Sequence, residues 1–154
     1  SAMVGRNYMT RVASGLVLIC CLSGLAFAQS NLVVPVFPNT LQWVSPPNLP
    51  ALKAVWVLGA EQQPGPYIFR VKLTANGRIP PHTHPDERNS TVLSGTIYVG
   101  FGEIFDENKV VAVPAGAVYV APAHVPHYVW AKDGDAEYQE AGIGPTGTVL
   151  LKRE

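Results

Sequence analysis

The chain has 154 residues, of which 47% are hydrophobic and only 14% are charged. Eleven basic side chains balance eleven acidic ones, so the composition indicates no basic surface and argues against nucleic acid as a partner. The length suits a single domain with its own hydrophobic core.

The first 28 residues have the features of a secretory signal peptide. Arg6 and Arg11 precede an apolar run at 12–28, which ends in the small-residue pattern Ala26-Phe27-Ala28. The alternative, a membrane anchor, is disfavoured because the run is short for a span. We predict cleavage after Ala28 and a periplasmic or secreted mature protein that no longer contacts the membrane. Without Arg6 and Arg11 it has 9 basic and 11 acidic side chains.

Composition divides the chain into three parts. Residues 1–28 form the leader, headed by Ser1-Ala2, which resembles a cloning remnant. Residues 29–52 are rich in proline and predict an extended arm, with a short strand at 41–44. Residues 53–154 form the folded domain. Both cysteines lie in the leader, at positions 20 and 21, so we expect no disulfide in the mature protein.

From residue 53 onward, short apolar and β-branched runs alternate with turn residues, and no 3.6-residue apolar period is evident. Many short strands without helices indicate an all-β sandwich or barrel. The expected strands are 53–58, 67–73, 91–93, 96–101, 109–113, 117–121, 127–131, 137–141 and 148–151.

All four histidines of the chain fall in two short blocks. His82 and His84 follow a strand-like run, and in extended backbone they project from the same face. His124 and His127 form the second block. Imidazole is the commonest metal ligand in proteins, and two imidazoles on one face can converge on a single ion.

Both blocks, with the glycines and proline around them, resemble the two motifs of the cupin superfamily. The first block departs from the family by one residue, since four residues instead of five separate its glycine from His82. In the second block, His124 replaces an inner glycine and Ala131 a terminal asparagine. The matching positions are Gly77, His82, His84 and Gly95 in the first block and Gly116, Pro122 and His127 in the second.

The resemblance spans about residues 56–145. Within this range the sequence is also similar to a group of small secreted cupins with one domain. It implies a double-stranded β-helix, which is the jelly-roll barrel of cupins. It further implies that His82, His84 and His127 ligate one divalent transition-metal ion, with zinc, manganese, iron and nickel as candidates. His124 is expected at the rim of the barrel rather than among the ligands.

The fourth ligand of the family, a glutamate, has no direct counterpart. Arg88 stands in its position and Glu87 lies beside it. A guanidinium has no lone pair to donate, so Arg88 cannot coordinate a metal.

Three interpretations of this departure remain open. In the first, the three histidines hold the ion alone and Arg88 faces the pocket to bind an anionic group. In the second, a bulge turns Glu87 inward as a fourth ligand and Arg88 outward. In the third, no metal is bound physiologically.

Two functions are compatible with these residues. The first is a metal-dependent enzyme acting on a small polar or anionic molecule, with Arg88 orienting the substrate and Glu87 as fourth ligand or general base. The second is a cupin without catalysis, which binds or senses a small ligand. Four aromatic residues are expected in the core or in a dimer interface rather than against substrate: Tyr98, Tyr119, Tyr128 and Trp130. We also predict a homodimer, for which the proline-rich arm with Trp43 is a candidate contact.

Overall fold

A computed structural model describes residues 35–151 of the chain. The leader at 1–28 and the predicted cleavage site lie outside these residues, and so does the start of the arm. Within 35–151 no helix is long and apolar enough to span a membrane.

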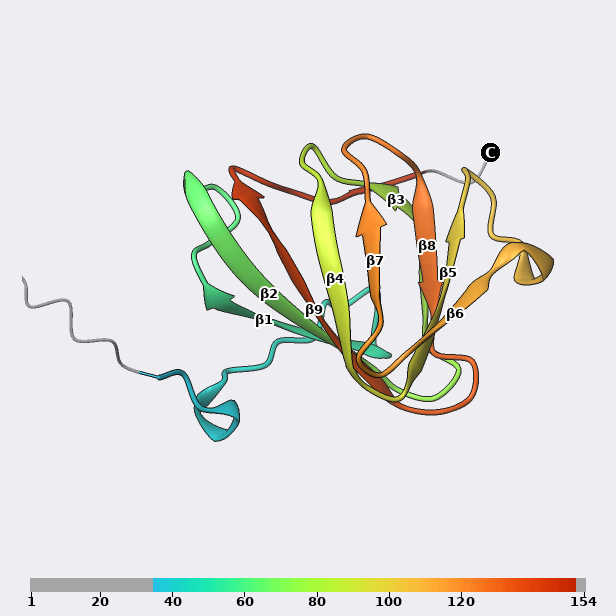
Figure 1. Ribbon diagram of the computed structural model, residues 1–154, viewed down its shortest axis with the longest axis horizontal. Helices are drawn as coiled ribbons and strands as arrows, with labels where there is room; N and C mark the ends of the chain where they lie inside the picture. Colours follow the sequence, from blue (N-terminus) through green and yellow to red (C-terminus); the bar gives the residue numbers. More distant parts are fainter. Residues whose placement is uncertain (1–34, 152–154) are drawn as a thin grey trace, which may run out of the picture. The chain divides into compact units, whose positions relative to one another are not determined.

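Ten strands form two antiparallel sheets, and the described residues contain no α-helix (Figure 1). Their bounds are β1 (Leu52–Leu58), β2 (Gly65–Leu73), β3 (Arg78–Thr83), β4 (Arg88–Ser94), β5 (Thr96–Phe101), β6 (Val111–Pro114), β7 (Val118–Ala121), β8 (His127–Trp130), β9 (Ala136–Gly144) and β10 (Val149–Leu150). Two 3-10 helices occur at Pro38–Thr40 and Glu107–Lys109.

Neither sheet follows the order of the sequence. The first sheet has the order β1-β2-β9-β4-β7 and the second has the order β10-β3-β8-β5-β6. The chain therefore passes repeatedly from one sheet to the other, which is the connectivity of a jelly roll. The prediction of an all-β jelly roll is confirmed.

The apolar core lies between the inward faces of the two sheets. Side chains alternate along each strand, so every second residue points into this layer. The core residues of the first sheet include Val71, Val92 and Tyr138, and those of the second include Ile97, Val99 and Val129. All six are at most 3% exposed.

The arm and one predicted strand differ from expectation. Of the short strand predicted at 41–44, only Val44 pairs, in an isolated bridge to Ala54 of β1. The run at 109–113 begins in a 3-10 helix, and β6 starts at Val111. The predicted strand at 41–44 does not extend further because Pro46 and Pro47 follow it, and proline lacks the N–H group that a β-ladder requires.

Candidate metal centre

A bulge made of two prolines turns His82 toward the core layer. Strand β3 pairs with β8 so that Ile79 lies opposite Val129 and His82 lies opposite His127. Pro80 and Pro81 together span the distance that one residue spans on β8, and the register shifts by one. Because of this shift, Ile79 and His82 both point inward although they are three residues apart.

The other two histidines reach the same place from different elements. His84 lies one residue beyond the end of β3, and its backbone carbonyl accepts a hydrogen bond of 2.8 Å from the N–H of His124. His127 is the first residue of β8. All three rings are buried: His82, His84 and His127 are 4%, 3% and 1% exposed.

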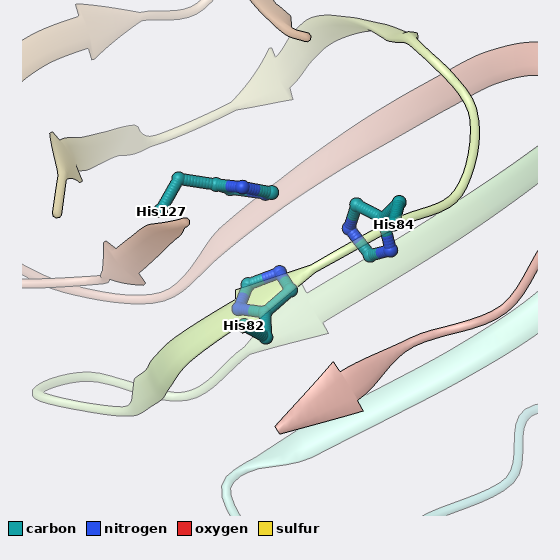
Figure 2. A group of neighbouring side chains, drawn as sticks. All are labelled: His82, His84 and His127. Atoms are coloured by element: carbon teal, nitrogen blue, oxygen red, sulfur yellow. The ribbon is translucent and has the colours of Figure 1, made fainter. Parts of the chain in front are cut away.

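The three imidazoles face one another (Figure 2). Each ring offers one nitrogen as a ligand atom, and these three nitrogens lie within 4.8 Å of one another. The ring centroids of His82 and His127 are 4.2 Å apart, and His84 lies 4.9 Å from His82 and 5.1 Å from His127. The structure thus brings together the three histidines that the cupin resemblance predicted.

Each imidazole is held by its Nδ1 atom. The Nδ1 atoms of His82 and His84 lie 2.8 Å from the carbonyl oxygens of Pro80 and Gly147, and Nδ1 of His127 lies 3.1 Å from that of Val125. A carbonyl oxygen only accepts, so each Nδ1 must carry the proton. The Nε2 lone pair of every ring is therefore left for another partner.

The electrostatic surroundings keep these rings neutral. Burial, with His127 and then Arg88 adding repulsion, lowers the pKa of His82 to about 4. Burial and the positive charge of Arg88 also lower the pKa of His84 and of His127. Neutral imidazole is the form that binds metal, so the site is prepared for a cation without first losing protons.

The donor set fits a divalent transition metal. The buried Nε2 atom of His84 has no hydrogen-bond partner among the described residues, and an unpaired buried polar atom is unfavourable. Three neutral imidazole nitrogens are typical ligands for zinc and its neighbours, and they leave coordination positions open. A bound ion would supply Lewis-acid chemistry at this point.

Arg88, the residue in the usual glutamate position, is buried in an ion pair. It is 3% exposed, and its Nη1 donates to Oε2 of Glu140 at 2.6 Å. Its Nη2 donates to Oγ1 of Thr146 at 2.8 Å and to the carbonyl oxygen of Gly147 at 3.1 Å. Burial raises the pKa of Glu140 even though Arg88 opposes the shift.

A second carboxylate completes this network. Oδ1 of Asp86 lies 3.8 Å from Nε of Arg88 and accepts a hydrogen bond from the hydroxyl of Thr146. Oδ2 of Asp86 accepts a hydrogen bond of 2.6 Å from the hydroxyl of Tyr67. Arg88 therefore stands between two carboxylates, and its charge is offset within the protein.

Glu87 and His124 lie outside this group. Glu87 is exposed and Arg88 points inward, which is the reverse of the bulge interpretation, so that interpretation of Glu87 as a fourth ligand is wrong. The bulge occurs instead at Pro80 and Pro81, where it orients His82. His124 is exposed and has a φ of 62°, as a residue in the place of a turn glycine requires.

Glu140 and Tyr119 were missed as members of the site. Glu140 lies on the same face of β9 as the buried residues Ala136 and Tyr138. The alternation of side chains in a strand therefore already placed a carboxylate on the inward face. Its partner was not visible, because Arg88 lies 52 residues earlier in the chain. Tyr119 was expected in the core or in a dimer interface, yet its hydroxyl is a buried polar atom beside this network.

Comparison with known proteins agrees with this geometry. The family model "Cupin domain" matches residues 69–139, which run from β2 to β9 and include all three histidines. The chain belongs to the cupin superfamily. A putative germin-like protein of Arabidopsis thaliana, subfamily 1 member 12, is 30% identical over 109 residues, which are 69% of this cupin and 44% of the relative. This cupin spans less than half the length of the curated relatives it matches.

Solved structures share the fold at low sequence identity. The polyketide cyclase RemF from Streptomyces resistomycificus aligns over 79% of this cupin and 89% of its own chain, with 17% identity and a TM-score of 0.63. The DMSP lyase DddQ from Ruegeria pomeroyi aligns over 75% and 64%, also with 17% identity and a TM-score of 0.63. These likenesses concern the arrangement of the strands.

Proposed function

We propose that this cupin binds one divalent transition-metal ion through His82, His84 and His127 and is a metal-dependent enzyme acting on a small polar or anionic molecule. The observation that carries the proposal is the common hydrogen-bond pattern of the three rings. Each Nδ1 is satisfied by a backbone carbonyl, which leaves each Nε2 lone pair free, and the three rings offer ligand nitrogens within 4.8 Å of one another. With only three protein ligands, coordination positions remain for water or substrate.

Metal analysis of protein purified without added metal tests the first half of this proposal. We expect close to one ion per chain, and close to none in the His82→Ala variant. His124→Ala is the matched control, because His124 belongs to the same two histidine blocks but is exposed. A metal content near zero in the unaltered protein, unchanged in His82→Ala, would contradict the proposal.

The second half, catalysis, depends on an exchangeable coordination position. Cobalt in place of the native ion would give a visible absorption spectrum that depends on the ligands around it. We expect this spectrum to change when azide is added, because azide can occupy an open position. A spectrum that azide leaves unaltered would indicate a closed site and favour the alternative function.

The alternative is a cupin that binds or senses a small ligand without catalysis. The ion pair of Arg88 with Glu140 favours it, because a guanidinium already paired at 2.6 Å is less available to stabilise charge in a reaction. Under this alternative the protein would bind ligand and metal, but no turnover would be found for any ligand that binds.

We also propose export of the protein and a homodimeric state. Export is supported by the sequence at 1–28, and the N-terminal residue of protein secreted from its native host would test it. For the dimer, the arm presents the exposed side chain of Val44 at the edge of β1, where Val44 bridges to Ala54. The neighbouring Trp43 stacks on Lys72 of β2 in the same chain, at 4.2 Å from the ring centroid. A monomeric mass from solution scattering would contradict the dimer.

A further inference from the structure

Three hydrogen-bond donors gather on the inward face of the first sheet. Ser90 on β4 pairs with Glu140 of β9 on one side and with Tyr119 of β7 on the other. Arg88 precedes Ser90 by two residues, so its side chain leaves β4 on the same face. We call Arg88, Ser90 and Tyr119 the donor patch.

Each member of the donor patch has a buried atom with no partner among the described residues. These atoms are Nε of Arg88, Oγ of Ser90 and the hydroxyl oxygen of Tyr119. Ser90 is 0% exposed and Arg88 is 3% exposed, so bulk water does not satisfy them. Burial raises the pKa of Tyr119, so its hydroxyl keeps its proton, and an interaction with the hydroxyl of Ser90 acts in the opposite direction. Ser90 and Tyr119 therefore partly satisfy each other. Ser90 can donate to the oxygen of Tyr119, which leaves the proton of Tyr119 and Nε of Arg88 as buried donors that require an acceptor.

The donor patch lies beside the three histidines. Arg88 and His84 hydrogen-bond to the same carbonyl oxygen, that of Gly147. Arg88 is thus adjacent to His84, and Ser90 follows Arg88 by two residues on β4. A molecule bound at the histidines would therefore have the guanidinium of Arg88 within reach.

The charges around the donor patch specify the kind of molecule. Arg88 is the one cation here, and it faces the two carboxylates of Asp86 and Glu140, while the histidines are neutral. Without metal this group of side chains is negative by one charge and repels an anion. A divalent ion makes it positive by one, and a ligand with a single negative charge then neutralises it.

We propose that the donor patch binds an oxygen of a small monocarboxylate whose other end reaches the metal. This inference rests on the proposed function, because the charge balance requires the ion. It names the substrate class as small organic acids with one carboxylate. The donors of Arg88, Ser90 and Tyr119 match the acceptor-only oxygens of a carboxylate.

Calorimetric titration of the full chain tests this proposal in two stages. Zinc is first titrated into metal-free protein, and acetate, glycolate and pyruvate are then each titrated into the zinc-loaded and the metal-free forms. Each acid is compared with its uncharged amide. We expect at least one acid to bind the zinc form about tenfold more tightly than its amide, since hydrogen bonds to charged groups are the stronger ones. We expect no measurable binding of that acid to the metal-free form.

Two variants assign the binding to the donor patch. Ser90→Ala and Tyr119→Phe each remove one hydroxyl, and each should weaken acid binding about tenfold while leaving the dissociation constant for zinc unchanged. The controls are Ser94→Ala and Tyr98→Phe. Ser94 is an exposed residue on the same strand, and the hydroxyl of Tyr98 bonds Asp133 at the surface. Neither control should alter acid binding.

The outcomes separate the two proposals. If zinc does not bind, the proposed function fails, and the monocarboxylate site fails with it. If zinc binds but no acid binds below about 10 mM, or if acid binding survives both hydroxyl deletions, only the monocarboxylate site is overturned. A crystal structure of the zinc form soaked in the acid, with water alone on the three donors, would overturn it equally.

Discussion

Arg88 and His84 donate hydrogen bonds to the same acceptor, the carbonyl oxygen of Gly147. The distances are 2.8 Å from Nδ1 of His84 and 3.1 Å from Nη2 of Arg88. Arg88 is not a ligand like the family glutamate, because a guanidinium has no lone pair to donate. It instead holds the backbone carbonyl that orients the ligand His84. Loss of a group that orients a metal-ligating histidine typically lowers metal affinity about 10- to 100-fold.

We expect Arg88→Lys to weaken metal binding about 10- to 100-fold. The lysine ammonium keeps the charge, but it lacks the planar fork that reaches Glu140, Thr146 and Gly147 together. Competition with a chromophoric zinc chelator measures the effect. Arg70→Lys is the control, because Arg70 bonds Gln139 on the outer face of the same sheet. Equal zinc affinity in Arg88→Lys and the unaltered protein would show that Gly147 does not need this support.

The buried ion pair also predicts an asymmetry in stability. Arg88→Met leaves the carboxylate of Glu140 without its partner and should lower the free energy of unfolding by about 3–5 kcal/mol. The double variant Arg88→Met with Glu140→Gln removes both charges and should recover part of this loss. Urea denaturation of the metal-free proteins measures both values. Equal stability of the single and double variants would contradict a buried pair.

Gly142 on β9 leaves space for the hydrogen bond between Tyr67 and Asp86. A Cβ atom at this position would lie 2.5 Å from the hydroxyl oxygen of Tyr67 and 2.6 Å from Oδ2 of Asp86. Gly142→Ala should therefore break the bond and destabilise the fold by about 1–3 kcal/mol. Gly134→Ala is the control, because a Cβ there meets nothing within 4 Å. Thermal unfolding of both variants measures the difference, and equal melting temperatures would count against the close packing at β9.

The low pKa of His82, about 4, predicts how the stability of the metal-free protein depends on pH. The unfolded chain takes up a proton at this residue near pH 6.5, whereas the folded protein does so only near pH 4. The free energy of unfolding should therefore fall as pH decreases through this window, by up to about 3 kcal/mol from His82. His82→Leu should flatten the curve, whereas His124→Leu should not. Denaturation midpoints at a series of pH values test this, and a curve that His82→Leu leaves unaltered would contradict the assigned pKa.

The same pKa values predict few protons released when the metal binds at pH 6. Ligand histidines with ordinary pKa values would already be partly protonated near pH 6.5, and their metal affinity would decline from there. Here burial lowers the pKa of all three rings, so zinc affinity should begin to decline at a lower pH than it would with exposed histidines. Calorimetry in buffers of different ionisation enthalpy measures the released protons. Release of a full proton at pH 6, below the range in which zinc-bound water ionises, would show that at least one ring is charged before binding.

Much of the architecture could be predicted from local patterns. Alternation at 67–73 predicts that Tyr67, Phe69, Val71 and Leu73 share one face of β2, and all of these except the partly buried Phe69 are fully buried. The resemblance of the two histidine blocks to the cupin motifs predicted which three rings would meet. These features are local because side-chain direction in a strand has a period of two, and a turn depends on the few residues that form it.

Three features of the site depended on contacts between distant segments. The register of β3 on β8 decides that the bulge falls at Pro80 and Pro81 and turns His82 inward. The position of β9 beside β4 decides that Arg88 meets Glu140. Sequence alone determined that this chain is a jelly roll with three candidate ligands. Only the tertiary structure decided the partner of Arg88 and the exposure of Glu87, because buried charges pair with whatever groups the sheets bring next to them.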